Sequence, residues 1–341
     1  MRRTTAMEVA RMAGVSQSSV SRAYTPGASV SPQMAEKVRQ AADHLGYRPN
    51  VLARSLITGT SRIIGLVVGH FENHFHPSAL ELLSRELKKN GYHILVFLAP
   101  NEESDTEEIV ADLLDYQVDG LIAASVAMTV PLASRCRAEG IPAILFNRHQ
   151  GEDGPTSVAS DNFDGARRVA HFLVAGGHQR IAHISGWRGS STGREREDGF
   201  RAGLQDFDVA LATCADGRYS RSAAAEACRS IFARGCPAPD AIFVGGDHMA
   251  FAVIDTLKSE LGIRVPEDVS VVGFDDVPLA AWPSYSLTTM RQPLERMVEA
   301  TVGKLLEAID QRNTPPVHLR FPCSLMLRGS ARLPEDRRHH E

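Results

Sequence analysis

The sequence predicts a small all-α head followed by an α/β body made of two doubly wound lobes. Three observations support this fold class: short helical patterns within the first fifty residues, apolar segments alternating with helical ones from Ile63 onward, and a length of 341 residues. At about 150 residues per domain, that length corresponds to two or three domains. The composition, 43% hydrophobic and 23% charged, is typical of globular proteins and excludes a mainly disordered chain.

The first two helices of the head are indicated by their capping residues. Thr5 and Glu8 have the T-x-x-E spacing of a capping box, so a helix is expected to begin near Ala6. Gly14 is expected to end it, because glycine adopts the positive φ that a tight turn needs. Ser16 is a suitable N-cap for a second helix.

A third helix is expected from Ser31-Pro32, with serine as the cap and proline at the first helical position. Its apolar residues recur at helical spacing up to Gly46, which ends it. These residues are Ala35, Val38, Ala42 and Leu45. Three short helices with a glycine turn between the first two predict a helix-turn-helix.

The charge is distributed unevenly along the chain. Residues 1–62 hold nine Lys/Arg and three Asp/Glu, a net charge of +6, whereas the remainder holds 28 and 38, a net charge of −10. A basic head on an acidic body predicts a polyanionic partner for the head alone.

The body alternates predicted strands and helices, which favours doubly wound parallel sheets. The predicted strands are Ile63–Val68, His93–Leu98, Gly120–Ala124, Ala143–Phe146, Ile181–Ser185, Ala241–Val244 and Val269–Gly273. The predicted helices lie near residues 78–90, 104–116, 131–139, 162–175, 194–206, 221–234 and 247–260. So many strands over about 270 residues exceed what one sheet usually contains, so two lobes are expected.

Three stretches resemble the LacI/GalR family of bacterial transcription regulators: TAMEVARMAGVSQSSVSR, LGYRPNVLARSL and SRIIGLVV. They cover about the first seventy residues without a gap, and the resemblance continues to about residue 330. It implies a body like that of periplasmic sugar-binding proteins, with a ligand between the lobes at the carboxyl ends of the strands. Crossovers between the lobes are then expected near Ser160, Met290–Pro293 and Arg320–Phe321.

The resemblance also implies the domain boundaries. We expect a helix-turn-helix DNA-binding domain at 1–48, a hinge helix and linker at 49–61, and an effector-binding and dimerisation domain at 62–331. Within the latter, lobe 1 spans about 62–160 and 292–320, and lobe 2 spans about 161–291 and 321–331. Residues 332–341 are expected to form a disordered tail.

By the same resemblance, the helix from Gln17 to Tyr24 enters the major groove of DNA. Gln17, Ser18 and Arg22 occupy the base-reading positions. Glutamine can pair with adenine and arginine with guanine, each worth about 1–3 kcal/mol of discrimination. Ser16 and Ser21 are expected to hold phosphates and fix the register. The alternative for Ser18 and Arg22 is a solvated polar face.

A hinge helix is expected over Val51 to Leu56, capped by Asn50. So short a helix is unstable in water, so it should fold only on DNA. The resemblance assigns Ala53 and Arg54 to DNA contact and Leu56 to a wedge that enters the minor groove. The alternative for Leu56 is contact with the body.

Effector-binding residues follow from the family's motifs one position at a time. Asn73 and Phe75 follow the first strand, where Phe75 would wall the pocket. Asp161 lies at the first crossover. Arg196 opens an R-x-x-G-F motif and would grip the ligand.

Three further positions belong to the second lobe. Tyr219 fits a position that is often aromatic and stacks on the effector. Asp275, in a G-F-D-D motif, would accept ligand hydroxyls or an amine, and Asp247 completes the set. Such groups in a mainly apolar cleft suit a sugar, a sugar derivative or a nucleobase-like ligand. The alternative for Asp161, Arg196 and Asp275 is a set of inter-lobe salt bridges.

Two departures from the family pattern affect this pocket. Gly246-Asp247 stands where the family usually has Asn-Asp, which predicts a larger or less polar ligand there. His74 and His76 replace a proline and an aromatic residue and make the first wall more polar. A regulator whose cleft has lost its ligand is therefore an alternative.

The expected function is a sequence-specific transcriptional regulator, a repressor, that binds a near-palindromic DNA operator and responds to a small polar effector. The chain ends in Arg337-Arg338-His339-His340-Glu341, without leucine heptads for a tetramer, so a homodimer is expected.

Two alternatives, a serine hydrolase and a metal site, have weak signals in the sequence. Gly189 to Gly193 fits the G-x-S-x-G pattern of serine hydrolases, but Ser191 is expected in a loop well after the strand rather than at a nucleophile elbow. His70, His74 and His76 lack a cysteine or carboxylate at ligand spacing, so no metal or other cofactor is expected.

A cytoplasmic protein without a membrane partner is expected. Glu8 and Arg11 interrupt any signal-peptide core, and no apolar run reaches the roughly 18 residues that span a bilayer. The five scattered cysteines suit free thiols in a reducing compartment. They are Cys136, Cys214, Cys228, Cys236 and Cys323.

Overall fold

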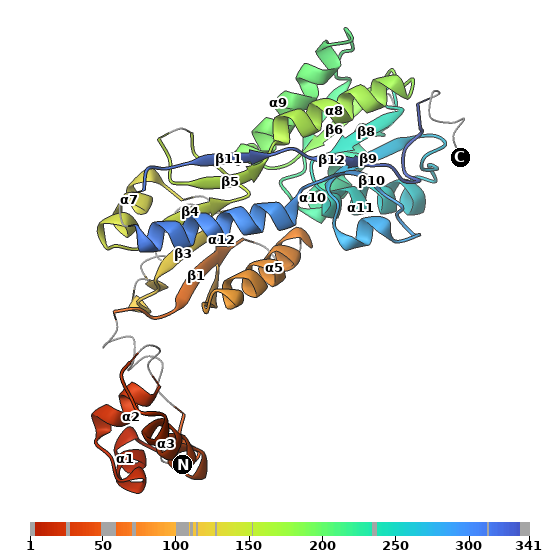
Figure 1. Ribbon diagram of the computed structural model, residues 1–341. Coiled ribbons are helices and arrows are strands. Elements are labelled where there is room, and N and C mark those ends of the chain that lie inside the picture. The colour runs from red at the N-terminus through yellow and green to blue at the C-terminus, as the bar shows by residue number, and fades with distance from the viewer. Residues whose placement is uncertain are drawn as a thin grey trace. The chain divides into compact units, whose positions relative to one another are not determined.

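The computed structural model describes residues 4–24, 28–48, 59–69, 73–99, 109, 112–113, 115–126, 128–151, 153–233, 237–311 and 314–334. The chain divides into two units, Met1–Ser61 and Arg62–Glu341, which are drawn in Figure 1. The smaller unit is the all-α head, and the larger one is the α/β body.

The head contains α1 (Ala6–Ala13), α2 (Gln17–Ala23) and α3 (Pro32–His44). The predicted caps are confirmed: Thr5 and Glu8 form a capping box, Gly14 ends α1 at φ 67°, and the Ser16 side chain accepts a hydrogen bond from the Ser19 amide. A small core of Val9, Ala10, Val20, Val38, Ala41 and Ala42 holds the three helices together. The predicted helix-turn-helix is confirmed.

The first lobe of the body is built on a six-stranded sheet of order β11-β5-β4-β3-β1-β2. Its strands are β1 (Ile63–Val68), β2 (His93–Leu98), β3 (Gly120–Ala124), β4 (Ala143–Phe146), β5 (Ser157–Ser160) and β11 (His318–Phe321). All of the pairings in this sheet are parallel. Parallel sheets are covered on both faces, which explains why β1 and β3 read as continuous apolar runs.

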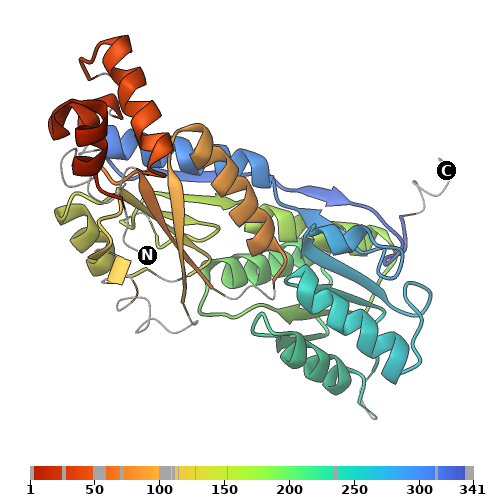
Figure 2. The ribbon, with the colours of Figure 1, turned by 90° about the horizontal axis from the view of Figure 1, so that it is seen from below.

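Helices cover both faces of this sheet. On one face α5 (Phe75–Lys89) and α12 (Leu294–Asp310) lie side by side, as both ribbon views show (Figures 1 and 2). On the other face α7 (Val130–Ala138) packs through Leu132 and Cys136 against Leu121 and Leu145. The lobe is therefore doubly wound.

The second lobe has a six-stranded sheet of order β12-β10-β9-β8-β6-β7, parallel except for β12. Its strands are β6 (Ile181–Ser185), β7 (Thr213–Asp216), β8 (Ala241–Val244), β9 (Ser270–Asp275), β10 (Thr288–Arg291) and β12 (Ser324–Met326). Its helices are α8 (Asn162–Ala175), α9 (Ser191–Gln205), α10 (Arg221–Ile231) and α11 (Asp247–Asp255), with a π-helical turn Thr256–Glu260 and a 3-10 turn Pro278–Ala281. The predicted pair of doubly wound lobes is thus confirmed.

The chain passes between the lobes three times. It leaves the first sheet after β5, returns between β10 and α12, and crosses again between β11 and β12, which follow one another in Figure 1. These passages fall at the segments where the sequence predicts crossovers.

Six predicted strands have the observed bounds, and the seventh, β9, begins one residue later and ends two residues later than predicted. Five strands and α12 lie at positions for which no element was predicted. The helix predicted near 104–116 falls largely outside the described residues. The expected loop position of Ser191 is wrong: it is the first residue of α9, because the Ser190 side chain accepts a hydrogen bond from the Gly193 amide and starts the helix there.

Candidate DNA-reading helix and inter-lobe ligand site

The expected base-reading helix presents a polar, exposed surface. Ser16, Gln17, Ser18, Ser21 and Arg22 are all exposed, whereas Val20 is buried in the head. The Arg22 guanidinium lies 3.4 Å from the Ser18 hydroxyl, one helical turn away. This is a face on which a long basic side chain and short hydroxyls are available for contact.

Four candidate DNA contacts lie outside the described residues. They are Asn50, Ala53, Arg54 and Leu56.

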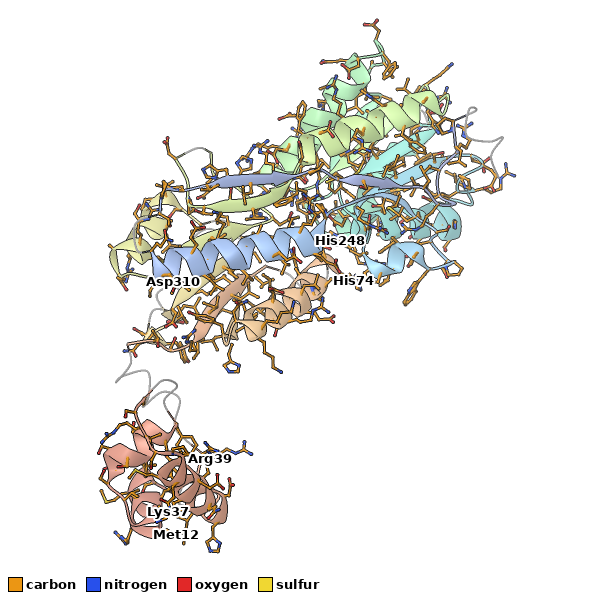
Figure 3. All side chains as sticks on the ribbon, in the orientation of Figure 1. Met12, Lys37, Arg39, His74, His248 and Asp310 are labelled. Atoms are coloured by element: carbon orange, nitrogen blue, oxygen red, sulfur yellow. The ribbon has the colours of Figure 1, made fainter. Side chains whose placement is uncertain are left out.

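The body contains a small cavity of about 50 Å³ at the junction of the lobes. It is lined by Gly69, Asn73, His76, Ser125, Asn147, Arg148, Trp187, Thr192, Arg196, Tyr219 and Asp275. Figure 3 places the nearby residues His74 and His248 at this junction, with Asp310 at the far end of α12.

Strand ends position five of the eleven lining residues. Gly69 follows β1, Ser125 follows β3, and Asn147 and Arg148 follow β4, while Asp275 ends β9. The carboxyl ends of two parallel sheets therefore face the same cavity, as is usual for ligand sites of open α/β sheets.

Several lining residues have a left-handed backbone. The φ angles are 57° for Ser125, 60° for Asn147, 53° for Tyr219 and 130° for Asp275. Non-glycine residues rarely adopt such angles, and they cluster at functional sites, where surrounding packing enforces them. The cavity is therefore held in a defined shape.

Arg196 is buried and fully engaged within the second lobe. Its Nε donates to the Asn162 side chain at 2.9 Å, its Nη1 donates to the Gly245 carbonyl at 2.6 Å, and its Nη2 lies 3.3 Å from Asp275. Its guanidinium also stacks 3.8 Å from the centre of the Phe274 ring. The Arg196–Asp275 ion pair thus lies within one lobe and does not bridge the two.

Asp275 lines the cavity and has one carboxylate oxygen without a hydrogen-bond partner among the described residues. Its Oδ1 accepts a hydrogen bond from Gln292 at 2.7 Å, whereas Oδ2 is buried with no hydrogen-bond partner among the described residues. Beside it, the position that a side chain would occupy on Gly246 lies 3.6 Å from Oδ2. The missing side chain at Gly246 leaves space next to a free carboxylate oxygen.

Three predicted effector contacts are absent from the described cavity lining. Phe75 is buried in the first lobe and stacks on Phe146, with ring centres 6.3 Å apart. The Asp161 side chain caps α8 by accepting the Asp164 amide. Asp247 is fully buried, and neither this residue nor Phe75 lines the cavity.

Asp247 connects three segments of the second lobe. Its carboxylate accepts hydrogen bonds from the Thr289 hydroxyl at 2.6 Å and the Val277 amide at 3.0 Å. Burial, with the nearby charge of Asp275, raises the pKa of Asp247. The residue holds β10 and the end of β9 in place around the cavity.

Other lining residues were not singled out from the sequence. Ser125, Asn147 and Arg148 directly follow predicted strands, so their strand-end position was a usable signal. Trp187 and Thr192 come from the turn and first helical turn after β6. They bring aromatic and hydroxyl groups to the cavity.

The geometry around Ser191 does not support a nucleophile. Its Oγ accepts a hydrogen bond from the His149 backbone amide at 3.2 Å, and the His149 imidazole pairs with Glu195 instead. Within the described ranges no group of three or more His, Cys, Asp or Glu side chains is placed to hold a metal ion, and His70 lies outside them. No helix that the structure describes is both long and apolar enough to cross a membrane.

Comparison with known proteins agrees with both units. The family model "Bacterial regulatory proteins, lacI family" matches residues 5–50, and the model "Periplasmic binding protein-like domain" matches residues 169–331. The regulator CelR of Thermobifida fusca is 32% identical over 96% of this chain and 98% of its own length. The ribose operon repressor of Escherichia coli (strain K12) is 29% identical over 96% of this chain and 99% of its own length.

Two solved structures match nearly the whole chain. The lac repressor dimer bound to operator and an anti-inducer matches with a TM-score of 0.86 and 27% identity, covering 96% of this chain and 99% of that one. The complex of CelR with cellobiose matches with a TM-score of 0.72 and 29% identity, covering 96% and 100%. The chain belongs to the lacI family of bacterial regulatory proteins.

Proposed function

We propose that this chain is a transcriptional repressor that binds a near-palindromic operator as a homodimer and is switched by a small polar effector between its lobes. The observation that carries this proposal is the combination of an exposed helix-turn-helix with a body whose cavity retains buried polar atoms without partners. Buried polar groups are almost always paired, so unpartnered ones in a cavity favour a ligand.

Gln17, Ser18 and Arg22 are proposed to read base edges, and Ser16 and Ser21 to hold phosphates. Their exposure on one short helix supports this. The hinge contacts Asn50, Ala53, Arg54 and Leu56 rest on the family resemblance. The division into 1–48, 49–61 and 62–331 is proposed with them.

For the effector, Asn73, Arg196, Tyr219 and Asp275 are proposed as contacts, because they line the cavity. The related CelR structure contains cellobiose, which supports a sugar-like effector here. The free oxygen of Asp275 beside Gly246 favours a ligand over a vestigial cleft. Phe75, Asp161 and Asp247 are proposed to support the pocket from outside it.

A homodimer is supported by the lac repressor, whose operator-bound structure is a dimer. Two copies would set two reading helices about one DNA turn apart. The curated relatives are transcriptional regulators, which supports a regulatory rather than an enzymatic role. Action on DNA is proposed to take place in the cytoplasm.

Selection of duplex DNA from a random pool by the full-length chain tests the head. We expect enrichment of a near-palindromic sequence, and loss of that enrichment in Gln17→Ala/Arg22→Ala. Arg229→Ala, which removes a surface arginine of the body paired with Glu260, is the matched control and should select the same sequence. Absence of an enriched sequence with the wild type would reject the proposal.

Leu56→Ala tests the proposed wedge. Operator affinity should fall, because less of the minor groove would be opened. Affinity for the effector should stay unchanged. Unchanged operator affinity would reject the wedge role of Leu56 without affecting the roles proposed for the other residues of the head.

A further inference from the structure

One arginine of the cavity has no counter-charge. Arg148 follows β4 and is only 9% exposed, its Nε is buried without a hydrogen-bond partner, and no ion pair between residues that the structure describes includes it. Its guanidinium lies 5.7 Å from the centre of the Trp187 ring. Burial lowers the pKa of Arg148 to about 10, so the group remains charged at neutral pH.

The second buried arginine of the cavity has polar and charged partners for its guanidinium. Arg196, at 3% exposure, binds an amide oxygen, a backbone carbonyl and a carboxylate. Buried charges are normally paired in this way. Arg196 is thus paired with a carboxylate, whereas Arg148 is buried without an anionic partner among the described residues.

The arginine and aspartate side chains of the described cavity lining have an excess of one positive charge. Arg148 and Arg196 contribute two positive charges and Asp275 one negative charge. A ligand with one negative charge would balance the cavity. The planar guanidinium matches a carboxylate through two parallel hydrogen bonds.

Two unpartnered hydrogen-bond acceptors of the cavity indicate which other groups the ligand carries. Asp275 Oδ2 and Asn147 Oδ1 are both buried without hydrogen-bond partners in the described structure. Both accept hydrogen bonds only, so they call for donors on the ligand. Hydroxyl groups supply such donors, and the Trp187 and Tyr219 rings border the same space.

We propose that the effector is a hydroxylated acid of the sugar-acid class, with its carboxylate on Arg148 and its hydroxyls on Asp275 and Asn147. The inference rests on the proposed function, since it takes the cavity as the effector site. It adds the charge of the ligand, which that function leaves open.

The test is thermal unfolding and calorimetric titration of the full-length chain with matched sets of ligands. Each set contains a neutral sugar, its uronic or aldonic acid and its phosphate: for example glucose, glucuronate, gluconate and glucose 6-phosphate, with galactose, ribose and cellobiose sets beside it. We expect one acid to raise the Tm and to bind at least tenfold more tightly than its neutral sugar.

Variants assign the acid group to its residue. Arg148→Met should lower the affinity for the acid at least tenfold and leave the affinity for the neutral sugar unchanged. Arg229→Met is the matched control: this surface arginine of the body pairs with Glu260, does not line the cavity and should leave acid binding intact. Without ligand, the Tm of Arg148→Met should equal or exceed that of the wild type, because an unpaired buried charge is removed.

The outcomes separate this inference from the proposed function. If a neutral sugar binds at least as tightly as its acid, and its affinity falls in Asp275→Asn, the cavity is the effector site but the effector is not an acid. If only the sugar phosphate binds, and its binding depends on Arg148, the proposal that the ligand carries a carboxylate is rejected. Failure of every acid, retention of acid affinity in Arg148→Met, or a large loss of Tm in that variant without ligand would overturn the inference.

Discussion

The carboxylate of Glu195 lies 2.8 Å from the imidazole of His149, and this contact joins the two lobes. Glu195 belongs to α9 of the second lobe, and His149 follows β4 of the first. Arg320 of β11 reaches the same carboxylate at 3.1 Å. Asn162 donates to Glu195 and accepts from Arg196, so the contact is two hydrogen bonds away from a cavity residue.

Glu195→Gln should weaken this contact while preserving its shape. We expect the free energy of unfolding at pH 7 to fall by about 1–3 kcal/mol, because His149 and Arg320 lose a charged acceptor. Urea denaturation measures the loss. Glu139→Gln, at an exposed pair with Arg135, should cost less than about 0.5 kcal/mol. Equal losses in both variants would show that the inter-lobe contact adds no stability.

The same variant should alter the response to acid. Burial raises the pKa of Glu195, but the hydrogen bond and charge of His149, with Arg320 and Asn162, outweigh this and lower it below the usual 4.5. Its stabilisation is therefore present above about pH 4.5 and is lost as the pH falls through the lowered pKa. Below pH 4.5 the wild type should lose its advantage over Glu195→Gln; a constant difference would contradict this.

Removal of Arg196 should destabilise the body strongly. Arg196→Met leaves the Asp275 carboxylate and the Asn162 amide oxygen without their partner in a buried site, at a cost of about 3–5 kcal/mol. Arg194→Met, two residues away on the exposed face of α9, should change stability by less than about 0.5 kcal/mol. Chemical denaturation of both variants checks this, and a loss below about 1 kcal/mol in Arg196→Met would contradict the packing described.

The buried His183 should make stability depend on pH. It stacks on Phe243 and lies fully buried, and burial lowers its pKa to about 4 from 6.5. Between those values the unfolded chain binds a proton that the folded chain does not, so stability falls as the pH drops from 6.5 to 4, by up to about 3 kcal/mol.

His183→Phe removes the titrating group and keeps an aromatic ring in contact with Phe200 and Phe243. Denaturation between pH 7 and pH 4 should show a weaker pH dependence than in the wild type. His44→Gln, at an exposed position of α3, should leave the dependence unchanged. The same slope in His183→Phe and the wild type would show that His183 already takes up a proton in the folded state.

Gly14 should be sensitive to substitution because of its backbone and not its surroundings. Its φ is 67°, and a side chain there would meet no atom within 4 Å. Gly14→Ala should destabilise the head by roughly 1 kcal/mol, and Gly14→Asn by less, since asparagine tolerates this region. Amide hydrogen exchange of α1 and α2 in the full-length chain measures both; equal protection in the two variants would contradict the argument.

The sequence was informative where local chemistry decides the structure. Apolar runs located β1, β3 and β8, and capping residues located all three helices of the head. The α12 helix was not predicted, although its buried residues recur at helical spacing. These residues are Met297, Val298, Thr301, Val302 and Leu305.

Other elements carried little local signal. The strands β5 (Ser157–Ser160) and β11 (His318–Phe321) are four residues long and partly polar, and their pairing with each other joins segments far apart in the chain. Their position is set by the fold of the lobe and not by their own composition.

The candidate site shows the same division. Arg196 and Asp275 were found from motifs, and Ser125, Asn147 and Arg148 could have been found as strand ends. Sequence motifs could not show that Asp247 is enclosed, because its partners Thr289 and Val277 come from distant segments.

Fluorescence anisotropy of the selected operator duplex, titrated with the full-length chain with and without a saturating effector, tests the central claim most directly. A switch worth about 1.4 kcal/mol of coupling or more would change operator affinity at least tenfold. Such a change, abolished in Asp275→Asn, is the predicted result. Operator affinity that stays the same with a ligand bound would contradict a regulator switched through its inter-lobe cavity.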